Sequence, residues 1–471
     1  MDTNELLIEL DTILNYYHCL FKGTGMRTEW FSLSNIYLII YALAWVWLFF
    51  YHKKKVSSFG AGSFLILLYV FFSLTSIVLF NRQEYVIGKS QGWEEVYLLP
   101  LVYLFLALWY TSTPILNYDK AKVNAIVPPN NILLYIIAIA IVVPSIWSMM
   151  TRWEYIVDGL AMILLNVDSA ADLYADKVDI YDNLSNDLQT ANIVVLLLHY
   201  LYTLFHDFNV LFFFYFLIVK KSKIIVFLLG VGTFFEILFS ISTGNRTDIF
   251  LPVLTIITTY LALSKFFSKD IKRIVLILST VVGAVIVIFF TIITVSRFND
   301  LSSGTQGSVV FYAGQATLNF DVYGFDNGGI RNGDRTMMLF KGWFDEKTPS
   351  NHEDLRTKYP TLKIDDGLFS TYIGDIMLDF GPLVSTMIFL MFTLIMNKIL
   401  RPQKGGYLYF DQIIPLYFII CVCSRGCMHL FDFSLKGGNW RIVGFMLIYM
   451  IFRFTRERKQ VRIINKSEYA S

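Results

Sequence analysis

The sequence predicts an all-α polytopic membrane protein with about eleven transmembrane helices, within a range of roughly ten to fourteen. Three observations support this fold class: 55% of the residues are hydrophobic, only 16% are charged, and long apolar runs recur along the whole chain. A helix needs about 20 mainly apolar residues to cross a bilayer. The runs that reach or approach this length are 32–51, 61–80, 96–113, 131–150, 192–219, 223–242, 249–264, 274–295, 382–400, 409–424 and 440–455.

The turns between these runs alternate between lysine-rich and lysine-poor, and the alternation predicts an orientation. Short turns that are rich in Lys and Arg remain in the cytoplasm. Basic residues gather at 53–55, 120–122, 220–223, 265–273 and 398–404. We therefore expect every second turn inside, followed by a basic cytoplasmic tail at 456–471. Because the number of spans is odd, segment 1–31 is expected at the outer face or along its interface.

The remaining chain, 32–455, is expected to form a single transmembrane domain with two outer loops. The first loop, 151–191, is rich in aspartate. The second, 296–381, begins with a polar stretch at 296–365 that is too long for a simple connector. Both loops are expected to face outward.

Charge and cysteine content exclude two classes of function. The net charge is only +2, and no basic patch with interleaved aromatic residues is present, so no nucleic acid is expected as a partner. The four cysteines, Cys19, Cys421, Cys423 and Cys427, lack the spacing of metal ligands. We expect neither a metal site nor a cofactor.

Ionisable side chains within the apolar runs are few and therefore informative, because each costs at least about 2.5 kcal/mol in the hydrocarbon. His199, His206 and Asp207 lie in the fifth run and Glu236 in the sixth. Two antiparallel neighbouring helices would bring Glu236 within reach of His206 or His199. Such an acid–imidazole pair would either stabilise a kink or hold two helices together, or it would serve as a proton path or a catalytic base.

The clearest candidate for a binding site is the short segment 242–248, STGNRTD, which joins two predicted spans directly. Gly244 allows backbone amides to approach a ligand closely. Arg246 precedes a helix whose first amides attract anions, and its planar guanidinium is suited to bidentate phosphate binding. The sequence predicts a diphosphate site here, with Asn245 beside it. The alternative is that Arg246 only pairs with Asp248 and anchors the turn.

A second span ends in a similar group, because Arg425, Gly426 and His429 follow the run 409–424. Arg425 repeats the chemistry expected of the first cluster. Histidine accepts protons near neutral pH, so His429 is a candidate base. A hydrogen-bonded structural histidine is the other interpretation.

A third polar cluster lies at 366–382, where apolar residues alternate with Asp375 and Asp379. The two aspartates are four residues apart and share one helical face. We expect a half-embedded helix with its carboxylates turned to a cavity, ending where Gly381 and Pro382 break into the next span.

These segments resemble the bacterial oligosaccharide repeat-unit polymerases of the Wzy type, which assemble O-antigen of lipopolysaccharide and related surface polysaccharides. The resemblance covers residues 195–455. It is carried by the glycine-arginine turn at 244–248, by FYAGQ at 311–315 and NFD at 319–321 in the outer loop, and by the stretch 372–381, whose DFG ending is similar to the family's Y-x-D-F-G.

The resemblance implies a fold related to the C-type glycosyltransferases and an active site that faces the periplasm or exterior of the bacterial plasma (inner) membrane. It implies a metal-independent glycosyltransferase that moves a growing glycan en bloc from undecaprenyl diphosphate to a single lipid-linked repeat unit. The partners would be undecaprenyl-diphosphate-linked oligosaccharides, membrane lipid and a chain-length regulator protein.

On this reading the site residues fall into three roles. Arg246 and Arg425 would hold the diphosphate, with Arg297 assisting. Asp375 or Asp379, and then His429, would accept the hydroxyl proton. The residues expected to contact substrate are Asn245, Arg331, Arg335 and Tyr372, and surface ion pairing is the alternative for Arg331 and Arg335.

Three other functions fit parts of the pattern. An O-antigen ligase-like glycan transferase would share the fold and the arginine chemistry. A flippase or transporter of lipid-linked oligosaccharides would need no base, but would place charges through the whole membrane instead of at the outer ends. A transferase that uses polyprenyl-monophosphate sugars would carry acids in its first outer loop, where Glu94 and Glu95 lie.

Overall fold

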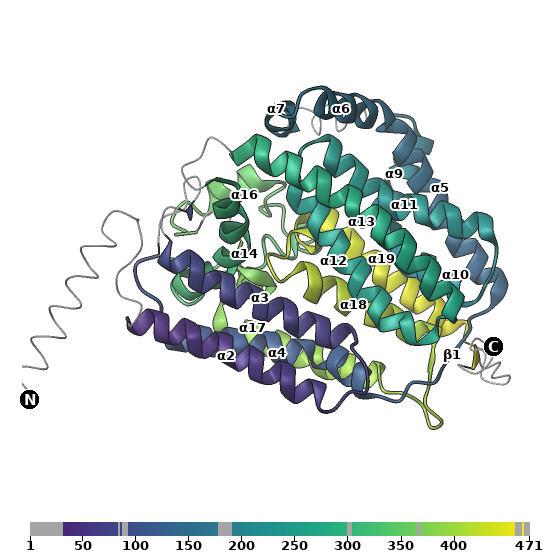
Figure 1. Ribbon diagram of the computed structural model, residues 1–471, viewed down its shortest axis with the longest axis horizontal. Coiled ribbons are helices and arrows are strands. Elements are labelled where there is room, and N and C mark those ends of the chain that lie inside the picture. The colour runs from purple at the N-terminus through teal and green to yellow at the C-terminus, as the bar shows by residue number, and fades with distance from the viewer. Residues whose placement is uncertain are drawn as a thin grey trace, which may run out of the picture.

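A computed structural model describes residues 32–82, 85–86, 93–177, 191–298, 304–364, 369–456 and 464–465. Helices dominate, and three short strands accompany them (Figure 1). The longer helices are α2 (Leu33–Lys53), α3 (Ala61–Asn81), α4 (Leu98–Lys120), α5 (Asn131–Thr151), α6 (Trp153–Leu165), α9 (Ile193–Phe205), α10 (Phe208–Ile218), α11 (Lys223–Ser242), α12 (Arg246–Leu263), α13 (Lys269–Phe298), α14 (Gly304–Tyr323), α17 (Thr371–Ile399), α18 (Phe410–Arg425) and α19 (Leu435–Phe454). The shorter helices are α7 (Ser169–Ala175), α15 (Met338–Gly342) and α16 (His352–Lys358), and the strands are β1 (Ala125–Val127), β2 (Tyr407–Tyr409) and β3 (Ile464–Asn465).

The chain is an all-α polytopic membrane protein. Within the described residues, eight helices are long and apolar enough to cross a membrane, and the bent pair α9 and α10 raises the number to nine. Helices α18 and α19 occupy the last two apolar runs, but they are not among these eight. The count of eleven spans therefore remains a prediction.

The turns that were predicted to share one side of the membrane lie at one end of the bundle, which we call the basic end. Strand β1, after α4, pairs in parallel with β2, before α18, and antiparallel with β3 of the tail. Lys221 Nζ donates to Asn131 Oδ1, and Lys265 Nζ lies 3.8 Å from the centre of the Tyr118 ring. Figure 1 shows β1 at this end. The alternation of turns is thus visible in the structure, whereas the side of the membrane that each end faces remains a prediction.

The helices form two groups that meet along α12 and α18. Helices α2, α3, α4, α14 and α17 pack together on one side, and α5, α9, α10, α11 and α19 on the other (Figure 1). Asn35 of α2 and Asn81 of α3 exchange reciprocal side-chain hydrogen bonds of 2.9 and 2.7 Å. Such amide pairs hold helices together where lipid tails provide no hydrophobic driving force.

Two helices are broken. Within α17, Gly381 has φ 72° and ψ 171°, directly before Pro382. This confirms the predicted break, because glycine tolerates these angles and proline cannot continue the preceding hydrogen-bond ladder. Helices α9 and α10 meet at an angle of 68°, with His206 and Asp207 between them. No glycine or proline in the apolar run 192–219 predicts this second break, although a kink-stabilising contact was one interpretation of its ionisable residues.

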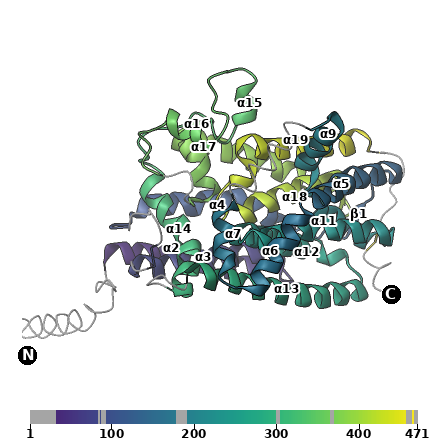
Figure 2. The same ribbon diagram turned by 90° about the horizontal axis from the view of Figure 1, so that it is seen from above.

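The two predicted outer loops are largely helical at the end opposite the basic end. Helix α14, within the polar stretch 296–365, packs along α3, where Ser76 Oγ donates to the Gly314 carbonyl over 2.9 Å. Helices α15 and α16 follow, and α15 stands out from the bundle (Figure 2). Segment 1–31 and residues 178–190 of the first loop lie outside the described residues, as does most of the tail.

Candidate functional site

Arg246 opens α12 after a tight turn that requires glycine. Gly244 has a φ of +63°, and a Cβ at this position would lie 2.4 Å from the Ala170 carbonyl oxygen. The Arg246 side chain is only 6% exposed. Its Nη1 donates to Thr294 Oγ1 over 3.3 Å and to Ser308 Oγ over 3.2 Å. Helices α13 and α14 therefore fix the guanidinium through hydroxyl groups.

An apolar cavity of about 310 Å³ lies beside Arg246, between α3, α12, α13 and α14. Its walls are mainly aromatic and branched aliphatic side chains, among them Phe71, Phe72, Phe250, Val253, Ile286 and Phe290. Phe71 is 46% exposed and Val287, also in the lining, is 63% exposed, so the cavity opens on the lipid-facing surface. A buried arginine at the wall of such a cavity suits an anionic head group with an apolar tail.

Two other predicted residues lie at the same turn. Arg297 Nη1 donates to the Gly244 carbonyl over 3.4 Å, and its guanidinium stacks 3.3 Å from the centre of the Tyr174 ring. Asn245 is buried and its Nδ2 donates to Asp248 Oδ2. Asp248 also lies 3.9 Å from Lys177 Nζ. Arg246 and Asp248 thus contact different partners on the two faces of α12.

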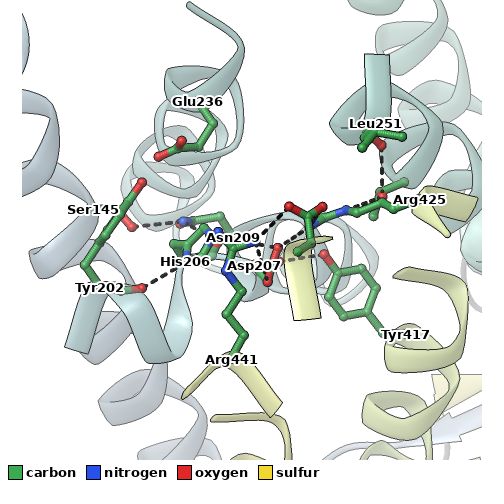
Figure 3. A network of polar contacts seen from close by, with 12 residues as sticks. Ser145, Tyr202, His206, Asp207, Asn209, Glu236, Leu251, Tyr417, Arg425 and Arg441 are labelled. Atoms are coloured by element: carbon green, nitrogen blue, oxygen red, sulfur yellow. Dashed lines mark hydrogen bonds and ion pairs between the residues drawn. The ribbon is translucent and has the colours of Figure 1, made fainter. Parts of the chain in front are cut away.

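Arg425, at the end of α18, lies in a network of buried charges (Figure 3). Its Nη1 lies 2.8 Å from Asp207 Oδ1 and 3.3 Å from Asp432 Oδ2, and its Nε donates to Thr255 Oγ1 over 2.9 Å. Tyr417 Oη donates to the Asp207 carbonyl over 2.6 Å. A diphosphate would have to displace two carboxylates from Arg425, so this geometry favours Arg246 as the anion-binding arginine.

A polar cavity of about 220 Å³ adjoins this network on the face of α12 opposite the apolar cavity. Arg441 Nη1 lies 3.3 Å from Asp432 Oδ1, and Arg152 Nη1 lies 3.6 Å from Glu236 Oε1. The expected acid–imidazole contact is therefore replaced by an ion pair between Glu236 and Arg152. His206 lines the same cavity, with its Nδ1 3.0 Å from the Tyr202 carbonyl.

The predicted bases Asp375 and Asp379 contact the two arginines of the outer loop. Asp379 Oδ1 lies 2.7 Å from Arg331 Nε, and Asp375 Oδ1 lies 3.4 Å from Arg335 Nη1. All four side chains are at most 1% exposed. Arg331 and Arg335 do form ion pairs, but the prediction that these pairs lie at the surface is wrong, because all four side chains are buried.

The second oxygens of the two aspartates are also occupied. Asp379 Oδ2 accepts hydrogen bonds of 2.6 Å from the amide and hydroxyl of Thr336, and Asp375 Oδ2 accepts one of 2.6 Å from the Leu430 amide. These contacts clamp the outer loop to α17 and to the segment after α18. A catalytic role for either carboxylate remains a prediction, and the contacts favour a positioning role.

His429 is buried, and burial lowers its pKa to about 4. Its Nδ1 accepts a hydrogen bond of 3.1 Å from the Phe431 amide, and its ring stacks on Phe431 with a centroid separation of 3.9 Å. In the neutral ring one nitrogen accepts and the other carries the proton. Nε2 therefore carries the hydrogen of the neutral ring, and it is buried without a hydrogen-bond partner among the described residues. Its predicted role as a base is not tested by this geometry alone.

Tyr372 lies in the core between α4, α17 and α18. It is 2% exposed, and its hydroxyl contacts Thr111 Oγ1 and lies 3.9 Å from Cys423 Sγ. Cys421, Cys423 and Cys427 are free thiols and buried. Within the part of the chain that the structure describes, no group of three or more His, Cys, Asp or Glu side chains could hold a metal ion.

The structure thus divides the predicted residues among three places. Arg246, Arg297 and Asn245 meet at the start of α12, Arg425 joins the charge network, and the remaining residues belong to the clamp or its surroundings. Three charged members of the polar cavity, Arg152, Asp432 and Arg441, were not singled out in the sequence. The position of Asp432 and Arg441 at the head of the last apolar run was the signal that could have found them.

Comparison of the chain with protein-family models, with curated proteins and with solved structures gives no match.

Proposed function

We propose that this protein is a glycosyltransferase that polymerises oligosaccharide repeat units carried on a polyprenyl diphosphate, such as undecaprenyl diphosphate, at the outer face of the bacterial plasma membrane. The observation that carries the proposal is the apolar cavity with Arg246 buried in its wall, at the end of the bundle opposite the basic end. Such a cavity suits isoprenoid units, and the guanidinium suits the diphosphate next to them.

The reaction needs two groups from the protein: a base for the hydroxyl proton and cationic donors for the leaving diphosphate. A hydroxyl oxygen of the acceptor unit attacks the anomeric carbon of the donor glycan, the bond from that carbon to the diphosphate oxygen breaks, and the diphosphate leaves on its lipid with the bonding electrons. The attacking hydroxyl gives its proton to a base. Preorganised cationic donors stabilise the negative charge on the departing oxygen. We assign this role to Arg246, with Arg297 beside it.

For the proton acceptor we propose Asp248, in place of the clamped Asp375 and Asp379. Asp248 lies two residues beyond Arg246, and it faces the polar cavity while Arg246 faces the apolar one. Its side chain is 48% exposed, whereas those of Asp375 and Asp379 are at most 1% exposed. A carboxylate that a substrate can reach is the better candidate for general-base catalysis.

The test is the replacement Arg246→Lys, read as glycan ladders in cells that depend on this protein for polymer. Lysine keeps the charge but lacks the planar fork, and loss of one preorganised donor typically lowers the rate about 10²- to 10³-fold. We expect the ladder to collapse to single repeat units at a normal protein level. Arg356→Lys, at an exposed site on α16, is the matched control and should leave the ladder unchanged. A full-length ladder from the Arg246→Lys protein would contradict the proposal.

A further inference from the structure

The polar cavity is a costly feature for a membrane protein. Its lining includes Asp207, Asn209, Glu236, Arg425 and Arg441, drawn from α10, α11, α18, α19 and the break before α10. Its volume of about 220 Å³ is many times the roughly 15 Å³ that one water molecule needs. Charged groups at this depth are expensive, and their presence usually marks a binding or transport site.

The charges around the cavity balance one another. Arg425 contacts Asp207 and Asp432, Arg441 contacts Asp432, and Arg152 contacts Glu236. A fourth carboxylate of the lining, Asp248, lies near Lys177. The three arginines are therefore matched by carboxylates. This balance does not favour an anionic ligand.

Several buried oxygens of the cavity have no hydrogen-bond partner within the described residues. They are Asp207 Oδ2, Asn209 Oδ1, Glu236 Oε1 and the hydroxyl of Tyr202. Asp207 Oδ2 lies 4.0 Å from Arg441 Nη1, and Glu236 Oε1 lies 3.6 Å from Arg152 Nη1, which are ion-pair distances longer than a hydrogen bond. An unsatisfied buried acceptor destabilises the fold, so these oxygens favour a ligand that brings hydrogen-bond donors.

The orientation of Asn209 is fixed by its partners. Its Nδ2 donates 2.9 Å hydrogen bonds to Ser145 Oγ and to the His206 carbonyl (Figure 3). Because a carbonyl oxygen can only accept, the amide nitrogen must be the atom that faces His206. Oδ1 must then point the other way, toward Gly232. A Cβ on Gly232 would come within 2.6 Å of this oxygen. Glycine at this position therefore leaves the carbonyl oxygen room within the cavity.

We infer that the polar cavity binds a sugar residue of the acceptor repeat unit, whose ring hydroxyls donate to Asp207, Asn209 and Glu236. The inference rests on the proposed function and gives it a second substrate site. Sugar hydroxyls supply the donors that the cavity oxygens need, and an uncharged ring suits its balanced charges. Asp248, the proposed proton acceptor, lines this cavity, whereas Arg246 lines the apolar cavity on the other face of α12.

Two probes separate this inference from the proposed function. One is the oligosaccharide released by mild acid from the polyprenyl diphosphate of cells that carry this chain, labelled with a fluorophore and free of lipid and phosphate. The other is farnesyl diphosphate, which has no sugar. Binding of each to the purified full-length protein in nanodiscs is measured for wild type, Glu236→Gln, Gly232→Ala and Gly230→Ala.

Glu236→Gln removes a charged acceptor, and Gly232→Ala moves Asn209 Oδ1; each should weaken oligosaccharide binding about tenfold or more. Gly230→Ala is the matched control, because it lies two residues away on α11 against Phe213 and lines a different cavity. It should bind the oligosaccharide as wild type does. Farnesyl diphosphate should bind all four proteins equally.

A wild-type protein that does not bind the oligosaccharide, or equal binding by all four proteins, would overturn the inference and leave the proposed function standing. Failure of the wild-type protein to bind farnesyl diphosphate would instead count against the proposed function.

If the variants fold poorly, Ser240→Cys provides a second measurement, because Ser240 lines the cavity. The oligosaccharide should slow labelling of this cysteine by N-ethylmaleimide and farnesyl diphosphate should not; unchanged labelling would overturn the inference.

Discussion

At the scale of single residues, the arginines show what the sequence can and cannot give. Sequence position singled out Arg246 and Arg425 at the ends of two apolar runs, and both are buried where a bundle end meets a cavity. Their partners were not predictable, because Ser308 and Asp207 come from elements far away in the chain. Removal of Arg425 would take away the 2.8 Å ion-pair partner of the buried Asp207 and leave it with Arg441 at 4.0 Å, at a cost of about 3–5 kcal/mol. Loss of function in an Arg425 variant would therefore not by itself indicate a contact with substrate.

The first prediction concerns His429 and the pH dependence of stability. Burial lowers its pKa to about 4, whereas an unfolded histidine has a pKa of about 6.5. The unfolded chain therefore binds the proton more readily, and the stabilising contribution of His429 is complete above pH 6.5. It should fall by about 1.4 kcal/mol for each pH unit between 6.5 and 4. Melting temperatures of the protein in detergent measure this fall.

His429→Asn provides the comparison, since an asparagine oxygen can accept the Phe431 amide but does not titrate. Its melting temperature should decline less than that of wild type between pH 6.5 and 4. Parallel curves for the two proteins would mean that His429 is not held neutral by burial.

At the scale of elements, apolar composition predicted most helices, and the positions of glycine and proline predicted one of the two breaks. Apolar runs mark where helices form, and the Gly381 and Pro382 pair marks the break in α17. The break between α9 and α10 has no glycine or proline. It is held by tertiary contacts of Asp207 and Asn209 with other helices, which local sequence does not contain.

The second prediction is that Gly381→Ala destabilises the protein by about 1–3 kcal/mol, because φ 72° with ψ 171° is a conformation that only glycine adopts without strain. The loss should appear as a lower melting temperature and faster proteolysis of the outer loop that Asp379 clamps. Gly283→Ala in α13 is the matched control, since nothing lies within 4 Å of the added Cβ. Equal melting temperatures for wild type and Gly381→Ala would show that the break carries no strain.

At the scale of the whole molecule, charge alternation predicted which turns share an end of the bundle, and the pairing of β1 with β2 and β3 agrees with it. The polar cavity could not be predicted in the same way. It arises where separate segments each bring a single charged residue to one place, and the periodicity of one segment says nothing of its neighbours. The 178–190 part of the first loop and segment 1–31 lie outside what the structure describes.

The third prediction fixes the orientation of the bundle. Phe344 follows α15 and is 90% exposed, so a cysteine there should react in intact cells with a membrane-impermeant maleimide. A cysteine in place of Lys404, in a basic turn, should react only after lysis. Both are made with Cys19→Ser, because Cys421, Cys423 and Cys427 are buried. The reverse pattern would place the Arg246 end in the cytoplasm and would remove the proposed site from the outer face.

The central claim is that this chain joins lipid-linked oligosaccharides at Arg246, and one reconstitution tests it most directly. Purified protein in liposomes is incubated with fluorescent polyprenyl-diphosphate-linked repeat units from its own cells, and the products are separated by length. The account predicts a ladder spaced by one repeat unit, matched by released polyprenyl diphosphate and absent with the Arg246→Lys protein. Movement of intact single units across the bilayer without a ladder would contradict the account and indicate a transporter of the same lipid.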